Sequence, residues 1–205
     1  MSGLFNALSW LQQNYIETLA VAAGLLYVFF TIKEKILLWL FGIISSGLYV
    51  FVFFKSGIYA YSALYVYYVV IGFYGWYNWA RKPEEAMKKE SLLKIHYASA
   101  GLLWICVSVT VVLSIPVYFA LKYFAGSDMA LADALMTSGG MIATWMLTQK
   151  IIEQWLFWIV IDLLSMSVMI YKDLYPSAGL FLIYTVLAVI GYIKWKNELQ
   201  KVALR

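Results

Sequence analysis

The sequence predicts an all-α polytopic membrane protein with seven transmembrane helices, in which a three-helix unit occurs twice. Hydrophobic residues make up 64% of the 205 residues, charged residues make up 13%, and the mean hydropathy is +0.79. A soluble domain of this size could not bury so much apolar surface, and long continuous apolar runs indicate helices rather than the alternating strands of a barrel. The repeat is indicated by the tripeptide Trp39-Leu40-Phe41, which returns as Trp155-Leu156-Phe157 at an offset of 116 residues.

Seven apolar stretches have lengths close to the ~20 residues that a helix needs to cross a bilayer. The predicted spans are about 16–32, 36–54, 58–80, 96–119, 131–147, 155–171 and 176–195. Pro116 is expected to kink or end the fourth span. Residues 1–15 contain no Lys or Arg and no small-residue cleavage site, so we do not expect a removable signal peptide there.

The repeat predicts three segments along the chain. Residues 16–80 form the first three-helix repeat, residues 81–130 the charged linker and a connecting fourth helix, and residues 131–196 the second repeat. Besides the two tripeptides, the offset pairs Gly75 with Gly191 and Trp79 with Trp195. An odd number of helices per repeat, followed by one extra helix, gives a parallel three-plus-one-plus-three plan with a pseudo-two-fold axis along the membrane normal.

The distribution of Lys and Arg between the loops predicts the orientation. With seven spans, twelve Lys and Arg residues fall on one side of the membrane and three on the other. Cytoplasmic loops carry the excess of basic residues, so we expect the N-terminus outside and the C-terminus in the cytoplasm.

Asp162 is the one carboxylate near the middle of the sixth span. An ionisable group at that depth costs several kcal/mol by insertion scales, on the order of 3 kcal/mol, and it is usually retained for function. Its counterpart in the first repeat is Ser46, so the two repeats offer a carboxylate and a hydroxyl at the same depth. Asp162 indicates a site for a cationic or hydroxyl-rich solute, or a proton relay; a protonated Asp bonded to a neighbouring helix is the other interpretation.

Aromatic side chains surround this position. Trp155 and Trp158 are three residues apart, and Trp158 and Asp162 four apart, so the three share one face of the predicted helix. An aromatic ring one turn from a carboxylate suits a flat, positively charged heterocycle. Other mid-span side chains that could either line the same path or simply pack are Tyr65, Tyr68 and Tyr184.

The sequence contains no Walker loop, no GxSxG, no HExxH and no cluster of Cys or His, so an ATPase, a metalloenzyme or a serine hydrolase has no support. We expect no enzyme activity, no cofactor and no metal. The single cysteine, Cys106, excludes a disulfide framework, and we assign no role to the single histidine, His96.

The residues that carry these features resemble a known family. The second half contains TQKIIEQWLFWIVIDLLSMSVMIYKDLY and then YTVLAVIGYIKWK, and the third span ends in FYGWYNW. These segments resemble the PnuC-type vitamin transporters, whose fold is similar to that of the sugar-transporting SWEET proteins. The resemblance implies facilitated diffusion of nicotinamide riboside, or of thiamin or riboflavin as in relatives. It also implies that a cytoplasmic kinase traps the solute by phosphorylation and that the protein forms a homotrimer. The protein is expected in a bacterial inner membrane, in contact with membrane lipid.

The resemblance assigns substrate-binding roles to residues of three spans. These residues are Trp155, Trp158 and Asp162 in the sixth span, Thr144, Trp145 and Gln149 in the fifth, and Trp76, Asn78 and Trp79 at the end of the third. On physical grounds alone, an interfacial aromatic belt with Asn78 as a helix cap is the preferred interpretation of the end of the third span. The solute would lie between the two three-helix units.

Nicotinamide riboside is the first choice of substrate and thiamin the second. Both are cationic aromatics that suit Asp162 and the tryptophans, whereas uncharged riboflavin would use Asp162 less fully. Two interpretations from other classes remain open. One is a proton-coupled transporter in which Asp162 titrates, and the other is a non-transporting membrane scaffold or receptor.

Overall fold

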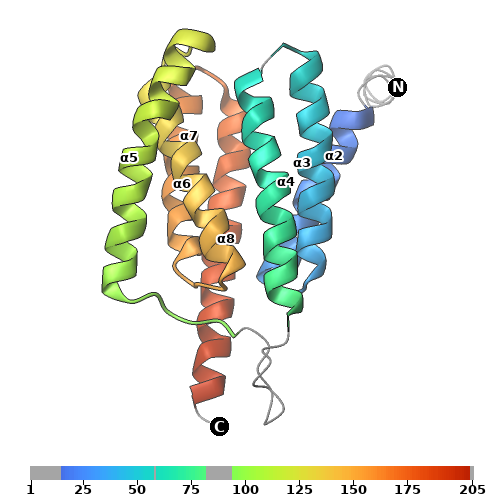
Figure 1. The fold of residues 1–205 in the computed structure, drawn as a ribbon, viewed down its shortest axis with the longest axis vertical. Coiled ribbons are helices and arrows are strands. Elements are labelled where there is room, and N and C mark those ends of the chain that lie inside the picture. Colours follow the sequence, from blue (N-terminus) through green and yellow to red (C-terminus); the bar gives the residue numbers. More distant parts are fainter. Residues whose placement is uncertain (1–14, 58, 82–93, 204–205) are drawn as a thin grey trace. The chain divides into compact units, whose positions relative to one another are not determined.

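The computed structural model describes residues 15–57, 59–81 and 94–203, and within these residues the chain forms seven α-helices (Figure 1). Their bounds are α2 (Tyr15–Ile32), α3 (Leu37–Lys55), α4 (Tyr59–Ala80), α5 (Ala100–Phe124), α6 (Ala130–Thr148), α7 (Gln154–Tyr171) and α8 (Tyr175–Ala203). Each predicted span has its helix, so the all-α fold with seven helices is confirmed.

Four of the described helices are long and apolar enough to cross a bilayer by length and composition: α3, α5, α7 and residues Ser177–Lys201 of α8. The described part of α2 includes the apolar stretch Ala22–Ile32. The remaining two helices have a more polar composition, because α4 is rich in tyrosine and α6 carries Ser, Thr and Gly residues and Asp133 in its first turn. Such side chains lower the hydropathy of a helix that also packs against other helices.

Three helix ends differ clearly from the predicted spans. The fourth helix begins at Ala100 rather than His96, since Ser99 is its N-cap and its side chain accepts a hydrogen bond from the Leu102 N–H at 3.2 Å. It also continues through Pro116 to Phe124, so the proline does not end it. The last helix runs to Ala203, beyond the predicted end at residue 195, and Lys201 pairs with Glu198 at 2.9 Å in that extension.

The described chain divides into two compact units, one up to Phe73 and one from Tyr74 onward, so the boundary falls within α4. In the first unit α2 and α3 lie side by side, and Ser45 Oγ donates to the Ala20 carbonyl at 2.8 Å. At Gly42 a Cβ atom would come within 2.9 Å of the Tyr27 ring, so this glycine allows the ring to lie directly on α3.

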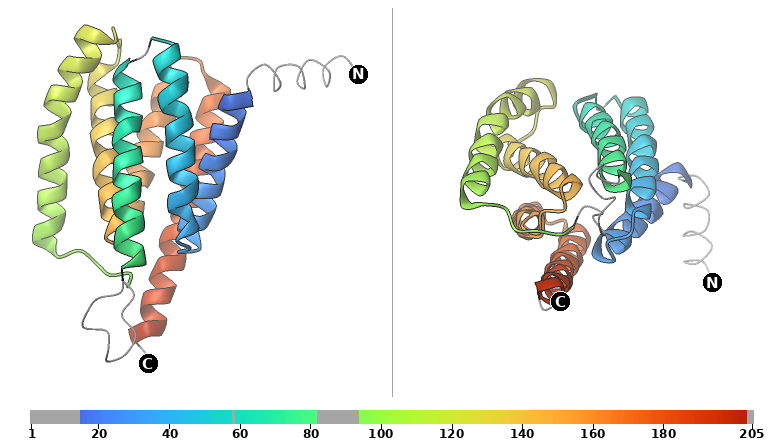
Figure 2. Two further views of the ribbon diagram at one scale, coloured as in Figure 1. Left: turned by 45° about the vertical axis from the view of Figure 1, so that its right-hand side comes forward. Right: turned by 60° about the horizontal axis from the view of Figure 1, so that its bottom comes forward.

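In the second unit α5 packs on α6, α6 on α7, and α7 on α8 (Figures 1 and 2, yellow-green to red). The segment before α5 is tied to the turn between α6 and α7. The His96 N–H donates to the Lys150 carbonyl at 3.2 Å, and the Ile152 N–H donates to the His96 carbonyl at 3.1 Å. Glu153 accepts a hydrogen bond from the Ala98 N–H at 3.0 Å. The role of His96 is therefore in its backbone, which no side-chain pattern reports.

The parallel three-plus-one-plus-three repeat and its segment boundaries stay predictions. Most of the charged linker and residues 1–14 lie outside the described residues.

Candidate functional site

A stripe on α7 carries the candidate site. Gln154, Trp158 and Asp162 follow one another at intervals of four residues, so they share one face of the helix. Asp162 is only 6% exposed and lies about 12 Å along the axis from the first residue of α7. Among the described residues none forms an ion pair with its carboxylate. The structure therefore has a buried carboxylate without a positively charged partner among the described residues, and such a group can bind a cation.

Gln154 is a member of this stripe that the sequence analysis missed. Its side chain is fully buried, and neither Nε2 nor Oε1 has a hydrogen-bond partner within the part of the chain that the structure describes. Leaving a buried polar group unpaired costs about 1–3 kcal/mol, so such groups are rare and call for an explanation. The only signal in the sequence was its spacing, one turn before Trp158, at a helix start where a polar residue needs no special reason.

The neighbouring helix α8 adds Tyr184 to the site. Tyr184 lies close enough to Asp162 for an electrostatic interaction, and its ring contacts Phe181 edge-on with centroids 6.2 Å apart. Trp158 is half-buried. The structure thus brings together three of the predicted site residues, Trp158, Asp162 and Tyr184, with Gln154 as a fourth.

Trp155 points to a different neighbour. Its ring meets Trp195 of α8 edge-on, with centroids 5.7 Å apart and an interplanar angle of 89°. A Cβ atom at Gly191 would lie 2.6 Å from the same ring, so α8 approaches Trp155 as closely as only a glycine permits. Trp155 is 3% exposed and packs α7 on α8, whereas Trp158 keeps part of its surface uncovered.

The predicted residues at the end of α4 bind the end of α6. Asn78 Nδ2 donates to the Thr148 carbonyl at 2.9 Å and to Gln149 Oε1 at 3.3 Å, and Trp79 Nε1 donates to the Leu147 carbonyl at 3.2 Å. The last carbonyls of a helix lack its regular donors, and Asn78 supplies one for Thr148. Trp79 is a second donor to the Leu147 carbonyl, which also accepts the Lys150 N–H at 3.0 Å. Asn78 is thus not the cap of its own helix, as the simpler interpretation had it, but a cap of α6.

Three further contacts complete this cluster. Gln149 Nε2 donates to the Tyr74 hydroxyl at 3.1 Å, and Lys150 Nζ lies 4.3 Å from the centroid of the Trp79 ring. The same ring lies 6.5 Å from that of Trp195. Trp76, one turn earlier on α4, is 37% exposed.

Two predicted site residues of α6, Thr144 and Trp145, make contacts within the helix and with the core of the second unit. Thr144 Oγ1 donates to the Gly140 carbonyl at 2.8 Å, one turn back in the same helix. Trp145 packs against a core cluster of Cys106, Met146 and Ile151.

The predicted site residues of the first unit contact other residues of that unit. Ser46 is 8% exposed. Tyr65 contacts Tyr49 at 4.9 Å and Tyr68 at 5.7 Å between ring centroids, within an aromatic cluster of α3 and α4.

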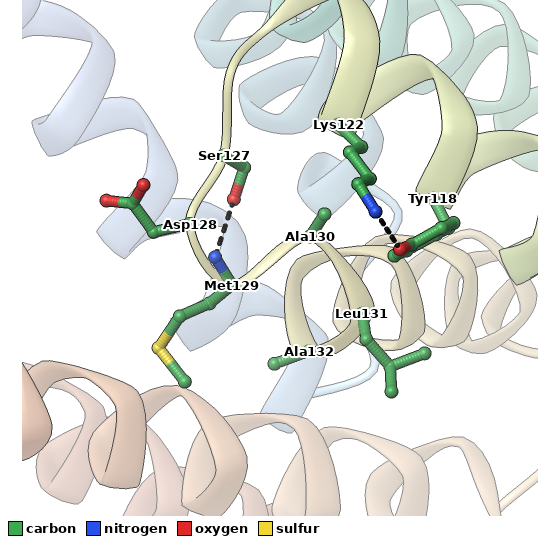
Figure 3. Close-up of a pocket in the computed structure, with 8 residues that line it drawn as sticks. All are labelled: Tyr118, Lys122, Ser127, Asp128, Met129, Ala130, Leu131 and Ala132. Carbon is green, nitrogen blue, oxygen red and sulfur yellow. Dashed lines mark hydrogen bonds between the residues drawn. The ribbon is translucent and has the colours of Figure 1, made fainter.

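An open pocket lies elsewhere in the second unit, between the end of α5 and the start of α6 (Figure 3). Lys122 Nζ donates there to the Tyr118 hydroxyl at 2.9 Å, and the turn from Ser127 to Ala132 forms the other wall. None of the predicted site residues lines it. In the described residues no three His, Cys, Asp or Glu side chains come together as metal ligands.

Comparison with known proteins identifies the family of the chain. Residues 14–197 match the model of a family described as nicotinamide mononucleotide transporter. The chain belongs to this family. It is 28% identical over 210 residues to the nicotinamide riboside transporter PnuC of Escherichia coli K12, covering 90% of this chain and 86% of that protein. It is 30% identical to the nicotinamide riboside transporter PnuC of Neisseria mucosa, covering 97% of this chain and 76% of that protein.

The fold also matches a solved structure. The crystal structure of the vitamin B3 transporter PnuC superposes with a TM-score of 0.72 at 24% identity, covering 95% of this chain and 86% of that chain. Family membership makes the protein a membrane transporter rather than an enzyme, and the resemblance stated from the sequence is confirmed. The spanning helices and the bacterial relatives support a multi-pass protein of a bacterial inner membrane.

Proposed function

We propose that the protein transports nicotinamide riboside across the membrane by facilitated diffusion and binds it on the α7 stripe of Gln154, Trp158 and Asp162. The observation that carries the proposal is this stripe, which combines a buried carboxylate and a buried, unpaired amide on one helix face. The names of the relatives support the choice of vitamin, since both curated relatives are nicotinamide riboside transporters.

The chemistry of the solute fits the stripe. The nicotinamide ring of the riboside is flat, carries a positive charge and bears a carboxamide, and its ribose bears hydroxyl groups. Trp158 would stack on the ring, since cations are attracted to the face of an indole. Asp162 would balance the charge, the Gln154 amide would pair with the carboxamide, and the Tyr184 hydroxyl would bond the sugar.

Other predicted features belong to the same proposal. The remaining candidate contacts of the vitamin are Ser46, Tyr65, Tyr68, Thr144, Trp145 and Trp76. A cytoplasmic kinase would trap the riboside by phosphorylation, the assembly would be a homotrimer, and the N-terminus would lie outside the cell.

Thiamin is the second candidate, because it is also a flat cation and would use Trp158 and Asp162 in the same way. Proton-coupled transport through Asp162 is the alternative mechanism. Counterflow of labelled vitamin in liposomes, with and without an imposed pH gradient, separates the mechanisms. Facilitated diffusion predicts exchange without any gradient and no accumulation of the vitamin when a pH gradient is imposed.

The test of the substrate is a thermal-shift panel with nicotinamide riboside, thiamin, riboflavin and a sugar on the purified protein, because a ligand that binds only the folded state raises its stability. Stabilisation by nicotinamide riboside and exchange of it in counterflow are the expected results. Binding without any counterflow would indicate a receptor. Stabilisation by thiamin alone would show that thiamin, and not nicotinamide riboside, is the substrate.

A further inference from the structure

We propose that Asn78 and Trp79 form a latch with the end of α6 that closes the transport path on one side of the membrane, and that they do not touch the vitamin. The inference rests on the proposed function, because only a transporter has to open and close this end of its helices.

The donors of both side chains are already used. Asn78 Nδ2 is bonded to the Thr148 carbonyl and to Gln149, and Trp79 Nε1 is bonded to the Leu147 carbonyl. Trp79 is 5% exposed, and Lys150 and Trp195 contact its ring. A bound vitamin would have to displace these contacts to accept a hydrogen bond from either residue.

The latch acts on main-chain groups that can exchange their partners. The Leu147 and Thr148 carbonyls belong to the last turn of α6, where water can take the place of a side chain. The Leu147 carbonyl also accepts the Lys150 N–H at 3.0 Å, so it keeps a main-chain partner when Trp79 leaves. The latch is therefore polar and reversible, unlike the close apolar contact of Trp155 with Gly191.

The turn held by the latch leads directly to the binding stripe. Lys150 has φ of 56°, a left-handed conformation that lysine rarely adopts and that surrounding contacts must maintain. Four residues later the chain reaches Gln154 at the start of α7. In the predicted repeat plan α4 ends the first repeat, while α6 and α7 belong to the second. In this proposal the contacts therefore break when the repeats move against each other during alternating access.

The experiment measures opening at the latch and affinity separately. In a Cys106→Ala background, Thr148→Cys places a thiol at a fully buried position beside the latch with little change in size, and its backbone carbonyl is kept. Asn78→Ala, the milder Asn78→Ser and Trp79→Phe are added one at a time, and Tyr77→Phe, at a 61% exposed position of the same helix, is the matched control. The readouts in liposomes are the rate of labelling by a hydrophilic maleimide and the Kd for nicotinamide riboside.

The latch predicts labelling at least fivefold faster in the Asn78 and Trp79 variants, a Kd within twofold of the parent, and no change in Tyr77→Phe. A Kd at least tenfold weaker with unchanged labelling would show that these residues bind the vitamin, and no change in either readout would show that they only pack; each result overturns the latch. If the parent protein binds no nicotinamide riboside, the proposed function fails, and the labelling rates still decide whether the latch opens.

Discussion

The same three positions have different chemistry in α3 and in α7. At the offset of 116 residues, Gln154, Trp158 and Asp162 of α7 correspond to Leu38, Gly42 and Ser46 of α3. Leu38 is fully buried and apolar where Gln154 is fully buried with an unpaired amide. Gly42 lies under the Tyr27 ring, where α7 has the half-buried ring of Trp158.

The residue next to the stripe is alike in the two helices. Trp39 is 1% exposed and Trp155 is 3% exposed, so each helix buries its first tryptophan. The contrast teaches that one helix pattern can serve packing alone or packing together with a site. In α3 the stripe has a single polar side chain, the buried Ser46, whereas the corresponding stripe in α7 has a buried carboxylate and a buried, unpaired amide.

The largest expected loss of stability tests the feature that α3 and α7 share, the buried first tryptophan. Trp39→Ala and Trp155→Ala should each lower stability by about 3–5 kcal/mol, because both remove a large buried ring. Thermal unfolding in detergent measures this, and Trp104→Phe on the exposed surface of α5 is the control. A Trp155→Ala protein as stable as the parent would contradict the packing role.

The glycines come next in size. Gly191→Ala and Gly42→Ala should each destabilise by about 1–3 kcal/mol, since the added Cβ meets an aromatic ring at 2.6 Å and 2.9 Å respectively. Gly47→Ala has open space around the added atom and should leave the melting temperature unchanged or raise it. Equal melting temperatures for the three variants would mean that the rings move aside.

The smallest change separates the two stripes. Gln154→Leu gives α7 the residue that α3 has at this position, and it should raise the stability of the ligand-free protein by about 1–2 kcal/mol by removing an unpaired buried amide. The same variant should bind nicotinamide riboside more weakly. Lower stability together with unchanged affinity would show that Gln154 is a packing residue.

The sequence alone predicted the helices well, because a bilayer demands long apolar segments and these are visible as runs. It placed Asp162 and Trp158 on one face, because the helical period fixes neighbours three and four residues apart. It also led to the family through the segment that begins at TQKIIEQW.

Contacts between distant helices could not be predicted in the same way. That Asn78 would bond the carbonyls of α6, and that Trp155 would pack on Gly191, depends on how helices approach each other. The unpaired amide of Gln154 was also invisible, because a missing partner is a property of the folded surroundings and not of the residue.

The most direct test of the α7 stripe compares the binding of a charged and an uncharged form of the same vitamin. The affinities of nicotinamide riboside and of its reduced, uncharged dihydro form are measured on the parent protein and on Asp162→Asn. The parent should prefer the cation by about tenfold or more, since 1.4 kcal/mol of charge attraction corresponds to a factor of ten, and Asp162→Asn should lose that preference. An unchanged preference in Asp162→Asn would contradict the assignment of the buried carboxylate to the vitamin.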